Sequence, residues 1–179
     1  ERGLPTIIDA DALTVLSTDG DLRELVRDHP CAVLTPHAGE FERLYAATFG
    51  RELDLSKGLG VRLRELSDAL DCFILHKGRI TTVTAPGQKI YGMNAGHSYA
   101  ATAGSGDVLS GILGATLAQV DAAEADAETI IMEILHAAAI HQHAAAIAAH
   151  TPDGFGLCSA SQIAAAVPQA IARLLVMQR

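Results

Sequence analysis

A glycine-rich turn that leads into a helix is the strongest chemical signal in this sequence. Residues 102–107 read Thr-Ala-Gly-Ser-Gly-Asp and run directly into the apolar segment 108–113. Glycines at positions 104 and 106 permit tight curvature, which leaves backbone N–H groups uncovered at the helix start. These N–H groups and the helix dipole attract anions, and we expect the Ser105 hydroxyl to cap the helix. The pattern predicts an anion hole formed by Gly104, Ser105 and Gly106.

Asp107 follows this turn and is the candidate catalytic residue. The positive field at a helix start favours its ionised form, so the carboxylate can act as a general base beside a bound phosphate. A helix start with a favourable first-turn charge explains the spacing equally well. The sequence contains no GxxxxGK[ST] loop, and the glycine turn does not follow a first strand in GxGxxG form. These absences argue against a Walker A loop and a Rossmann dinucleotide site.

Two further clusters follow strand-like runs. In Thr-Pro-His-Ala-Gly-Glu at 35–40, we expect His37 to project at a sheet edge. Glu40 is expected in the first turn of the next helix, where it can hold a water or part of a Mg²⁺ shell. In Lys-Gly-Arg-Ile-Thr at 77–81, Gly78 permits close approach to a ligand, and Lys77 or Thr81 can contact phosphate or ribose. A capped helix with exposed side chains and a tight turn between strands are the respective structural alternatives.

Alternating strands and helices must position these clusters. The order of apolar runs and helical patterns predicts an α/β fold, a three-layer αβα sandwich with a mainly parallel sheet, in a single domain over residues 1–179. In such sheets ligands bind at the carboxyl ends of the strands, where Asp9 and Asp11 also fall, although a turn or cap role suits them at least as well. Strands are expected at 6–9, 31–34, 72–75, 81–84 and 89–91, and helices at 21–27, 39–49, 56–70, 105–119, 125–150 and from 159 onward with a kink at Pro168.

Composition excludes several classes of protein. The 179 residues are 49% hydrophobic and 19% charged, which is a globular balance. A net charge of −8 without a basic cluster argues against nucleic-acid binding. The apolar stretch 130–149 carries Glu133 and three histidines, so we expect a buried helix and no membrane span.

Cysteines and histidines give no sign of a metal centre. Three cysteines without a CxxC pair predict reduced, partly buried thiols in a cytoplasmic protein. His136, His143 and His150 recur every seven residues, which is about 10.5 Å along a helix and too far for neighbours to share one metal. We expect them to be packed or surface histidines.

Together, these segments resemble the ribokinase superfamily and, within it, the ADP-dependent NAD(P)H-hydrate dehydratases. The matching pieces span nearly the whole chain in the family's order, and the TPHxGE and GSGDVLxGI segments together are typical of the dehydratase branch. Ala38 stands where the family usually has Pro, Ser105 where the turn often has Met, and Ala103 where Gly is common. The pieces read IIDADALTVL, LTPHAGEFERL, LHKGRITTV, NAGHSYAATAGSGDVLSGILGATLAQ, AAIHQHAAAIAA and ASQIAAAVPQAI.

The resemblance implies a lyase that removes water from hydrated NADH or NADPH (NADHX or NADPHX) while ADP is converted to AMP and phosphate. It implies that Asp107 is catalytic, that His37 and Asp107 contact the hydrated dinucleotide, and that Mg²⁺ is required, with Glu40 a candidate for its water shell. A cytoplasmic homo-oligomer is also expected. The residues implied to hold the adenine nucleotide are Lys77, Gly78, Arg79, Ile80, Thr81 and Gly106.

Family members carry further residues before the first matching strand. We therefore expect a chain that is N-terminally truncated relative to the family, either as a piece of a longer protein or as a shortened paralogue. Two other functions stay open. The same base and anion hole would serve a ribokinase-like kinase of a small alcohol or vitamin precursor, and a non-catalytic nucleotide-binding paralogue would keep only the binding site.

Overall fold

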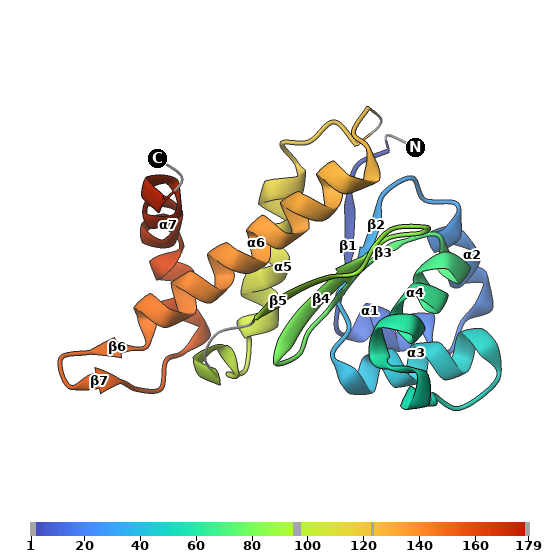
Figure 1. Cartoon of the computed structure of the whole chain (residues 1–179), viewed down its shortest axis with the longest axis horizontal. Helices are drawn as coiled ribbons and strands as arrows, with labels where there is room; N and C mark the ends of the chain where they lie inside the picture. Colours follow the sequence, from blue (N-terminus) through green and yellow to red (C-terminus); the bar gives the residue numbers. More distant parts are fainter. Residues whose placement is uncertain (1–2, 95–97, 123, 178–179) are drawn as a thin grey trace.

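The central sheet is parallel on one side and antiparallel on the other. The computed structural model describes residues 3–94, 98–122 and 124–177 (Figure 1). The strand order is β1-β2-β3-β4-β5; β1, β2 and β3 run parallel, and β4 and β5 extend the sheet as antiparallel neighbours. The strands are β1 (Thr6–Ile8), β2 (Ala32–Leu34), β3 (Phe73–His76), β4 (Ile80–Thr84) and β5 (Tyr91–Asn94).

Helices cover both faces of this sheet, which confirms the three-layer arrangement (Figure 1). One layer contains α1 (Asp11–Leu16), α2 (Gly20–Arg27), α3 (Ala38–Phe49) and α4 (Leu59–Leu70). The other contains α5 (Ser105–Leu117) and α6 (Ala127–Ala148), and α7 (Ala160–Met177) packs against α6 away from the sheet. Shorter elements are the 3₁₀ turns η1 (Leu55–Lys57) and η2 (Ser98–Ala100) and the hairpin of β6 (His150–Thr151) and β7 (Gly154–Phe155).

Successive side chains of the central strands enter opposite layers. Val33 and Leu75 pack with α5 and α6, whereas Leu34 and Ile74 pack with the layer of α1 to α4. All four are fully buried. A strand that is covered on both faces reads as a continuous apolar run, and for this reason β2 and β3 were predictable within one residue.

Several element boundaries differ from the predictions. The helix expected over 56–70 is broken, because Gly58 has a φ of +87° and separates η1 from α4. This backbone conformation cannot continue a right-handed helix, and glycine adopts it at little cost. Residues 11–16 form a helix where we predicted a loop, and β5 begins at Tyr91, two residues later than expected. The β6–β7 hairpin was not predicted.

Helix α6 is the apolar segment expected to be buried. Among the described residues it is the one helix long and apolar enough to cross a membrane, and 44% of its most apolar window is buried inside the protein. It packs between α5 and α7, and Ile131, Ile134 and Ala137 are fully buried. The prediction of a packed helix is confirmed. Asp126 caps its first turn by accepting from the Thr129 N–H at 2.8 Å.

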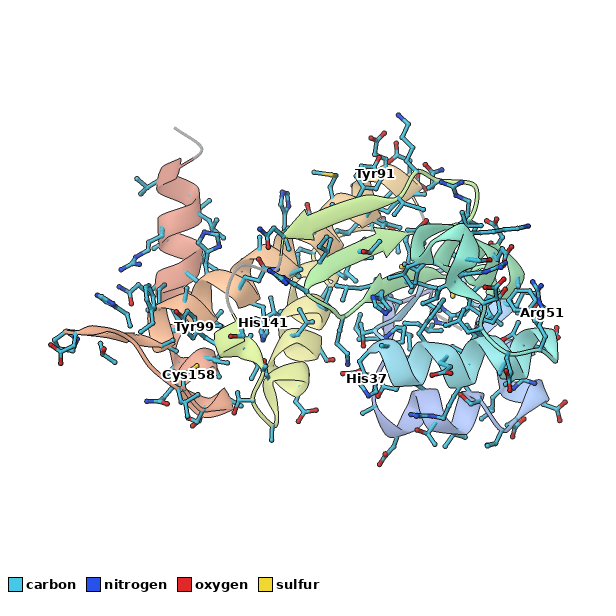
Figure 2. All side chains as sticks on the ribbon, turned by 60° about the horizontal axis from the view of Figure 1, so that its bottom comes forward. His37, Arg51, Tyr91, Tyr99, His141 and Cys158 are labelled. Carbon is cyan, nitrogen blue, oxygen red and sulfur yellow. The ribbon has the colours of Figure 1, made fainter. Side chains whose placement is uncertain are left out.

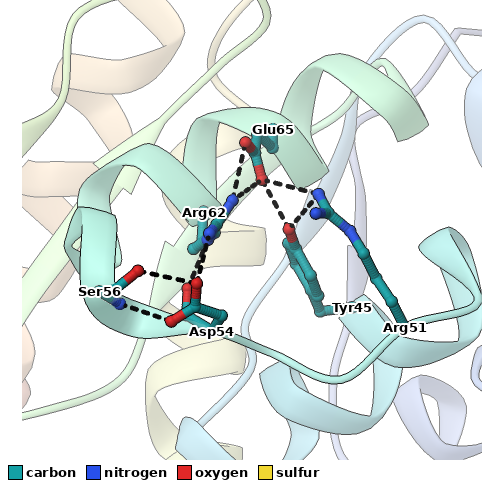
Figure 3. Close-up of polar contacts among 6 residues, drawn as sticks. All are labelled: Tyr45, Arg51, Asp54, Ser56, Arg62 and Glu65. Carbon is teal, nitrogen blue, oxygen red and sulfur yellow. Dashed lines mark hydrogen bonds and ion pairs between the residues drawn. The ribbon is translucent and has the colours of Figure 1, made fainter.

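A polar network joins η1 to α3 and α4 (Figure 3). The Tyr45 hydroxyl donates to Glu65 at 2.6 Å, and Arg62 donates to both oxygens of the same carboxylate. Arg62 is 3% exposed, and its hydrogen bonds and ion pair with Glu65 outweigh burial and raise the pKa of the guanidinium. Arg62 also donates to the Asp54 carbonyl. This network lies toward the C-terminal end of α3, opposite the end that begins at His37 (Figure 2), so its role is structural.

Candidate active site

The carboxyl ends of β1, β2 and β3 bring two of the predicted clusters, residues 35–40 and 77–81, next to Asp9. The backbone N–H of Lys77 donates to the Pro36 carbonyl at 2.8 Å, and His37 and Lys77 form an isolated parallel bridge. The Lys77 ammonium lies 2.6 Å from a carboxylate oxygen of Asp9, which follows β1. The expectation that these segments meet at one sheet edge is confirmed.

Asp9 anchors the Lys77 ammonium, a role that we did not predict from the sequence. Its second carboxylate oxygen accepts from the Ser110 hydroxyl of α5 at 2.9 Å. Burial raises the pKa of Asp9, but hydrogen bonds from Lys77, Thr35 and Ser110 outweigh it, so the pKa lies below its ordinary value. The ionised carboxylate therefore ties β1, β3 and α5 together. In the sequence, the one indication of this role was the position of Asp9 directly after a strand-like run.

The glycine turn presents backbone N–H groups at the start of α5. Gly104 is the N-cap, with a φ of +81°. The Ser105 N–H already donates to the Thr102 carbonyl at 3.1 Å, whereas the N–H groups of Gly104, Gly106 and Asp107 have no acceptor among the described residues. The Asp107 N–H is thus a candidate donor to an anion beside those of Gly104 and Gly106, whereas the Ser105 N–H is already bonded. Asp107 itself is exposed in the first turn, so the turn is open to solvent.

The Ser105 hydroxyl does not cap the helix, contrary to our prediction. Because the helix begins at Ser105 with Gly104 as N-cap, this side chain turns inward, and its oxygen lies 3.0 Å from Nε2 of His141 on α6. Ser105 and His141 are 5% and 8% exposed. Burial lowers the pKa of His141. A hydrogen bond with the Ser105 backbone raises it, but the effect of burial is larger.

Gly104 is constrained by its dihedral angle and by its surroundings. A Cβ atom at this position would lie 3.1 Å from the Cβ of Ala160, and the positive φ disfavours any L side chain. An L-residue in the left-handed conformation costs about 1–2 kcal/mol. We expect Gly104→Ala to reduce the free energy of unfolding by more than this amount, because of the added contact with Ala160. Urea unfolding measures the change. Gly50→Ala is the matched control, since Gly50 has a φ of +63° and nothing within 4 Å of its Cβ position. Equal losses for both variants would show that the contact with Ala160 carries no energy.

Gly106 faces Asp9 and Lys77 across a short gap. A Cβ atom at this position would lie 3.6 Å from Oδ2 of Asp9 and 3.7 Å from Nζ of Lys77. Both distances are ordinary van der Waals contacts. Gly106 thus lies next to the Lys77 ammonium, and Asp107 follows at the same turn. Backbone N–H groups at a helix start, together with one ammonium, are suited to hold a phosphoryl group.

His37 and Glu40 form a capping box at the start of α3. Nδ1 of His37 accepts from the N–H groups of Gly39 and Glu40, and the Glu40 carboxylate accepts from the His37 N–H at 2.8 Å. Nε2 of the same ring lies 3.4 Å from Oε1 of Glu40. The capped-helix alternative is confirmed, with one correction: His37 is exposed, but Glu40 is 7% exposed and not a surface residue.

Five of the six residues predicted to hold the nucleotide are consecutive, from Lys77 to Thr81, and their surroundings are unequal. Gly78, Arg79 and Ile80 are exposed, Lys77 is half-buried, and Thr81 is buried within β4. The preceding residue, His76, packs edge-on against Phe41 and has a buried Nδ1 without a hydrogen-bond partner among the described residues. Burial and the nearby His37 lower the pKa of His76.

Two carboxylates approach the Lys77 ammonium and are the groups that could help to hold a cation. Asp9 lies 2.6 Å and Glu40 3.9 Å from Nζ. Carboxylate oxygens suit Mg²⁺, which keeps several waters and shares ligands with phosphates. Within residues 3–94, 98–122 and 124–177, the structure contains no group of three or more His, Cys, Asp or Glu side chains that could hold a metal ion.

A separate cavity of about 430 Å³ lies between β1, α1 and α2. Its lining is almost wholly apolar and includes Ile8, Val15, Leu22 and Leu25. The cavity does not include the glycine turn, Lys77 or His37. It offers few polar groups to orient a nucleotide, so the site at the sheet edge is the better candidate for chemistry.

Known proteins resemble this chain in sequence and in fold. It is 40% identical to the bifunctional NAD(P)H-hydrate repair enzyme Nnr of Corynebacterium glutamicum, over 97% of this chain and 33% of that protein. It is 39% identical to the ADP-dependent (S)-NAD(P)H-hydrate dehydratase of Neisseria meningitidis, over 64% of this chain and 38% of that protein. The chain thus spans about a third of the length of these relatives.

Two solved structures share the fold. A ribokinase-like superfamily protein from Enterococcus faecalis matches with a TM-score of 0.71 and 23% identity, over 97% of this chain and 54% of that one. The ADP/ATP-dependent NAD(P)H-hydrate dehydratase of Bacillus subtilis, co-crystallised with ATP and Mg²⁺, matches with a TM-score of 0.63 and 24% identity, over 79% of this chain and 47% of that one. The family model for NAD(P)H-hydrate dehydratase covers residues 1–166. With the expected fold and the glycine turn in place, the chain belongs to the NAD(P)H-hydrate dehydratase family.

Proposed function

We propose that this chain carries the catalytic site of an ADP-dependent NAD(P)H-hydrate dehydratase, which repairs NADHX and NADPHX. One observation carries the proposal: Gly106, whose N–H has no acceptor among the described residues, lies beside the Lys77 ammonium, and the N–H and carboxylate of Asp107 follow at the same turn. Phosphate binding and proton abstraction can therefore occur at a single turn.

The proposed reaction begins when the C6 hydroxyl of the hydrated nicotinamide attacks the β-phosphoryl group of ADP. A new oxygen–phosphorus bond forms, the bond to AMP breaks, and Asp107 takes the hydroxyl proton. Lys77 and the two amides stabilise charge on the transferring phosphoryl group. Phosphate then leaves C6, expelled by the lone pair of the ring nitrogen, and loss of a proton from C5 restores the double bond. The products are NADH or NADPH, AMP and phosphate.

The remaining predicted residues have binding roles in this proposal. The exposed His37 ring lies at the sheet edge, where it can contact the hydrated dinucleotide. The exposed turn from Gly78 to Ile80 approaches the adenine nucleotide, with Gly78 leaving room beside the backbone. Thr81 is buried in β4, so its contribution is to hold the turn.

Asp9 and Glu40 would hold Mg²⁺ together with water and nucleotide oxygens. Their oxygen donors fit this ion, and both already face a cation, the Lys77 ammonium. When bound, Mg²⁺ would neutralise part of the negative charge of the diphosphate. Within the protein, the capping box holds the Glu40 carboxylate in place, and Ser110 orients that of Asp9.

Assembly and location are further parts of the proposal. Helix α7 exposes Ile171, Leu175 and Val176, an apolar surface that supports self-association into a homo-oligomer. The three cysteines are free and buried, which supports a reducing, cytoplasmic environment.

The decisive experiment offers hydrated NADH and ADP to the purified full-length protein and follows reduced-nicotinamide absorbance with AMP and phosphate release. We expect absorbance to recover only when ADP is present, in equal proportion to AMP. ATP-dependent phosphorylation of a small alcohol without this recovery would make the protein a ribokinase-like kinase. Nucleotide binding without either turnover would make it a non-catalytic paralogue.

A further inference from the structure

A buried pair of side chains lies directly behind the glycine turn. His141 lies in the second half of α6, and its Nε2 is 3.0 Å from the Ser105 hydroxyl (Figure 2). Both residues are more than nine-tenths buried. Ser105 immediately precedes Gly106 and Asp107, whose N–H groups form the proposed phosphoryl site. The bond therefore connects the core of the helical layer to the residues that face the ligand.

The Ser105 hydroxyl is the sole polar side chain within residues 103–106, which read Ala-Gly-Ser-Gly. Glycines on both sides of Ser105 give the backbone wide conformational freedom. Besides the backbone bonds of Ser105 to Thr102 and of Val108 to Gly104, residues 103–106 have one side-chain partner, His141, which contacts the Ser105 hydroxyl. A buried hydrogen bond has one geometry, and its loss leaves a desolvated partner behind.

We propose that His141 is a positioning residue that acts through the Ser105 hydroxyl and keeps the Gly106 and Asp107 N–H groups aimed at the phosphoryl group. The inference rests on the proposed function, because it assigns a purpose to the orientation of those amides. His141 does not touch the ligand in this arrangement. Since burial lowers its pKa, the ring stays neutral and adds no charge to the site.

A double-mutant cycle in kcat tests this coupling. We expect His141→Leu and Ser105→Ala each to lower kcat about ten- to hundredfold, because small misplacements of catalytic groups have effects of this size. The double variant should be no slower than either single one, since both remove the same bond. His141→Gln, which keeps a hydrogen-bonding amide, should recover much of the rate. His136→Leu is the control, an exposed histidine of the same helix that faces Glu133.

Additive losses in the double variant would overturn the proposal, and so would a His141→Gln variant as slow as His141→Leu. Either result would mean that the ring acts by packing alone. Thermal unfolding of each variant checks that kcat is compared between folded proteins.

A second measurement does not depend on dehydratase activity. Inorganic phosphate is titrated while the amide resonances of Gly106 and Asp107 are followed by NMR. We expect both amides to shift in the wild type and in His141→Gln, with clearly weaker phosphate affinity in His141→Leu. Unchanged phosphate affinity in His141→Leu would contradict the positioning role, even if hydrated NADH proved to be a substrate. If hydrated NADH is not a substrate but this difference is seen, the proposed function fails and the positioning role stands.

Discussion

Asp107→Asn is expected to lower kcat for dehydration about 10²- to 10⁴-fold, the range that general base catalysis contributes. Asparagine has nearly the shape of aspartate but cannot accept the hydroxyl proton. The side chain is exposed, and the backbone N–H at position 107 is retained, so the fold and the phosphoryl site should persist. Stopped assays of AMP release give kcat, and calorimetry gives the affinity for ADP, which we expect to be maintained.

The matched control for this substitution is Asp21→Asn. Asp21 is likewise an exposed aspartate in the first turn of a helix, α2, but it lies away from the sheet edge. Any loss of favourable charge at a helix start is shared by both variants. Wild-type turnover in Asp107→Asn would remove the general base from the mechanism, whereas equal losses in both variants would point to helix stability.

Gly106→Ala is expected to leave the protein folded and to weaken ADP binding by at least about tenfold, the equivalent of about 1.4 kcal/mol. A methyl group at this position contacts Asp9 and Lys77 at ordinary distances, so it fits the free protein. It would nevertheless occupy the space beside the two free N–H groups, which a phosphate must approach closely. Calorimetric titration with ADP measures the effect.

Gly111→Ala separates this effect from helix propensity. Gly111 lies in the same helix with nothing within 4 Å of its Cβ position. Alanine is the better helix former by about 1 kcal/mol, so each variant gains some stability from this source. Undiminished ADP affinity in Gly106→Ala would mean that the diphosphate binds away from the turn. A variant that fails to fold would contradict the fit inferred from the distances.

Local sequence patterns located most elements and the order of the clusters at the sheet edge. Apolar runs identified β2 and β3, and the glycine turn identified the start of α5. The Thr-Pro-His-Ala-Gly-Glu segment indicated a helix start, which the structure contains as a capping box. These features depend on residues within one turn or strand of each other, so composition and spacing are sufficient to predict them.

Partner choice between distant segments was not predictable in the same way. Asp9 meets Lys77 across 68 positions and Ser110 across 101, and Ser105 meets His141 across 36. We predicted a cap for Ser105, because Ser is common at helix starts, yet its hydroxyl turns toward α6. Such contacts follow from the packing of α5 against α6 and from the parallel order of the strands. A single sequence records the residue types but not which side chains the folded layers bring within hydrogen-bond distance.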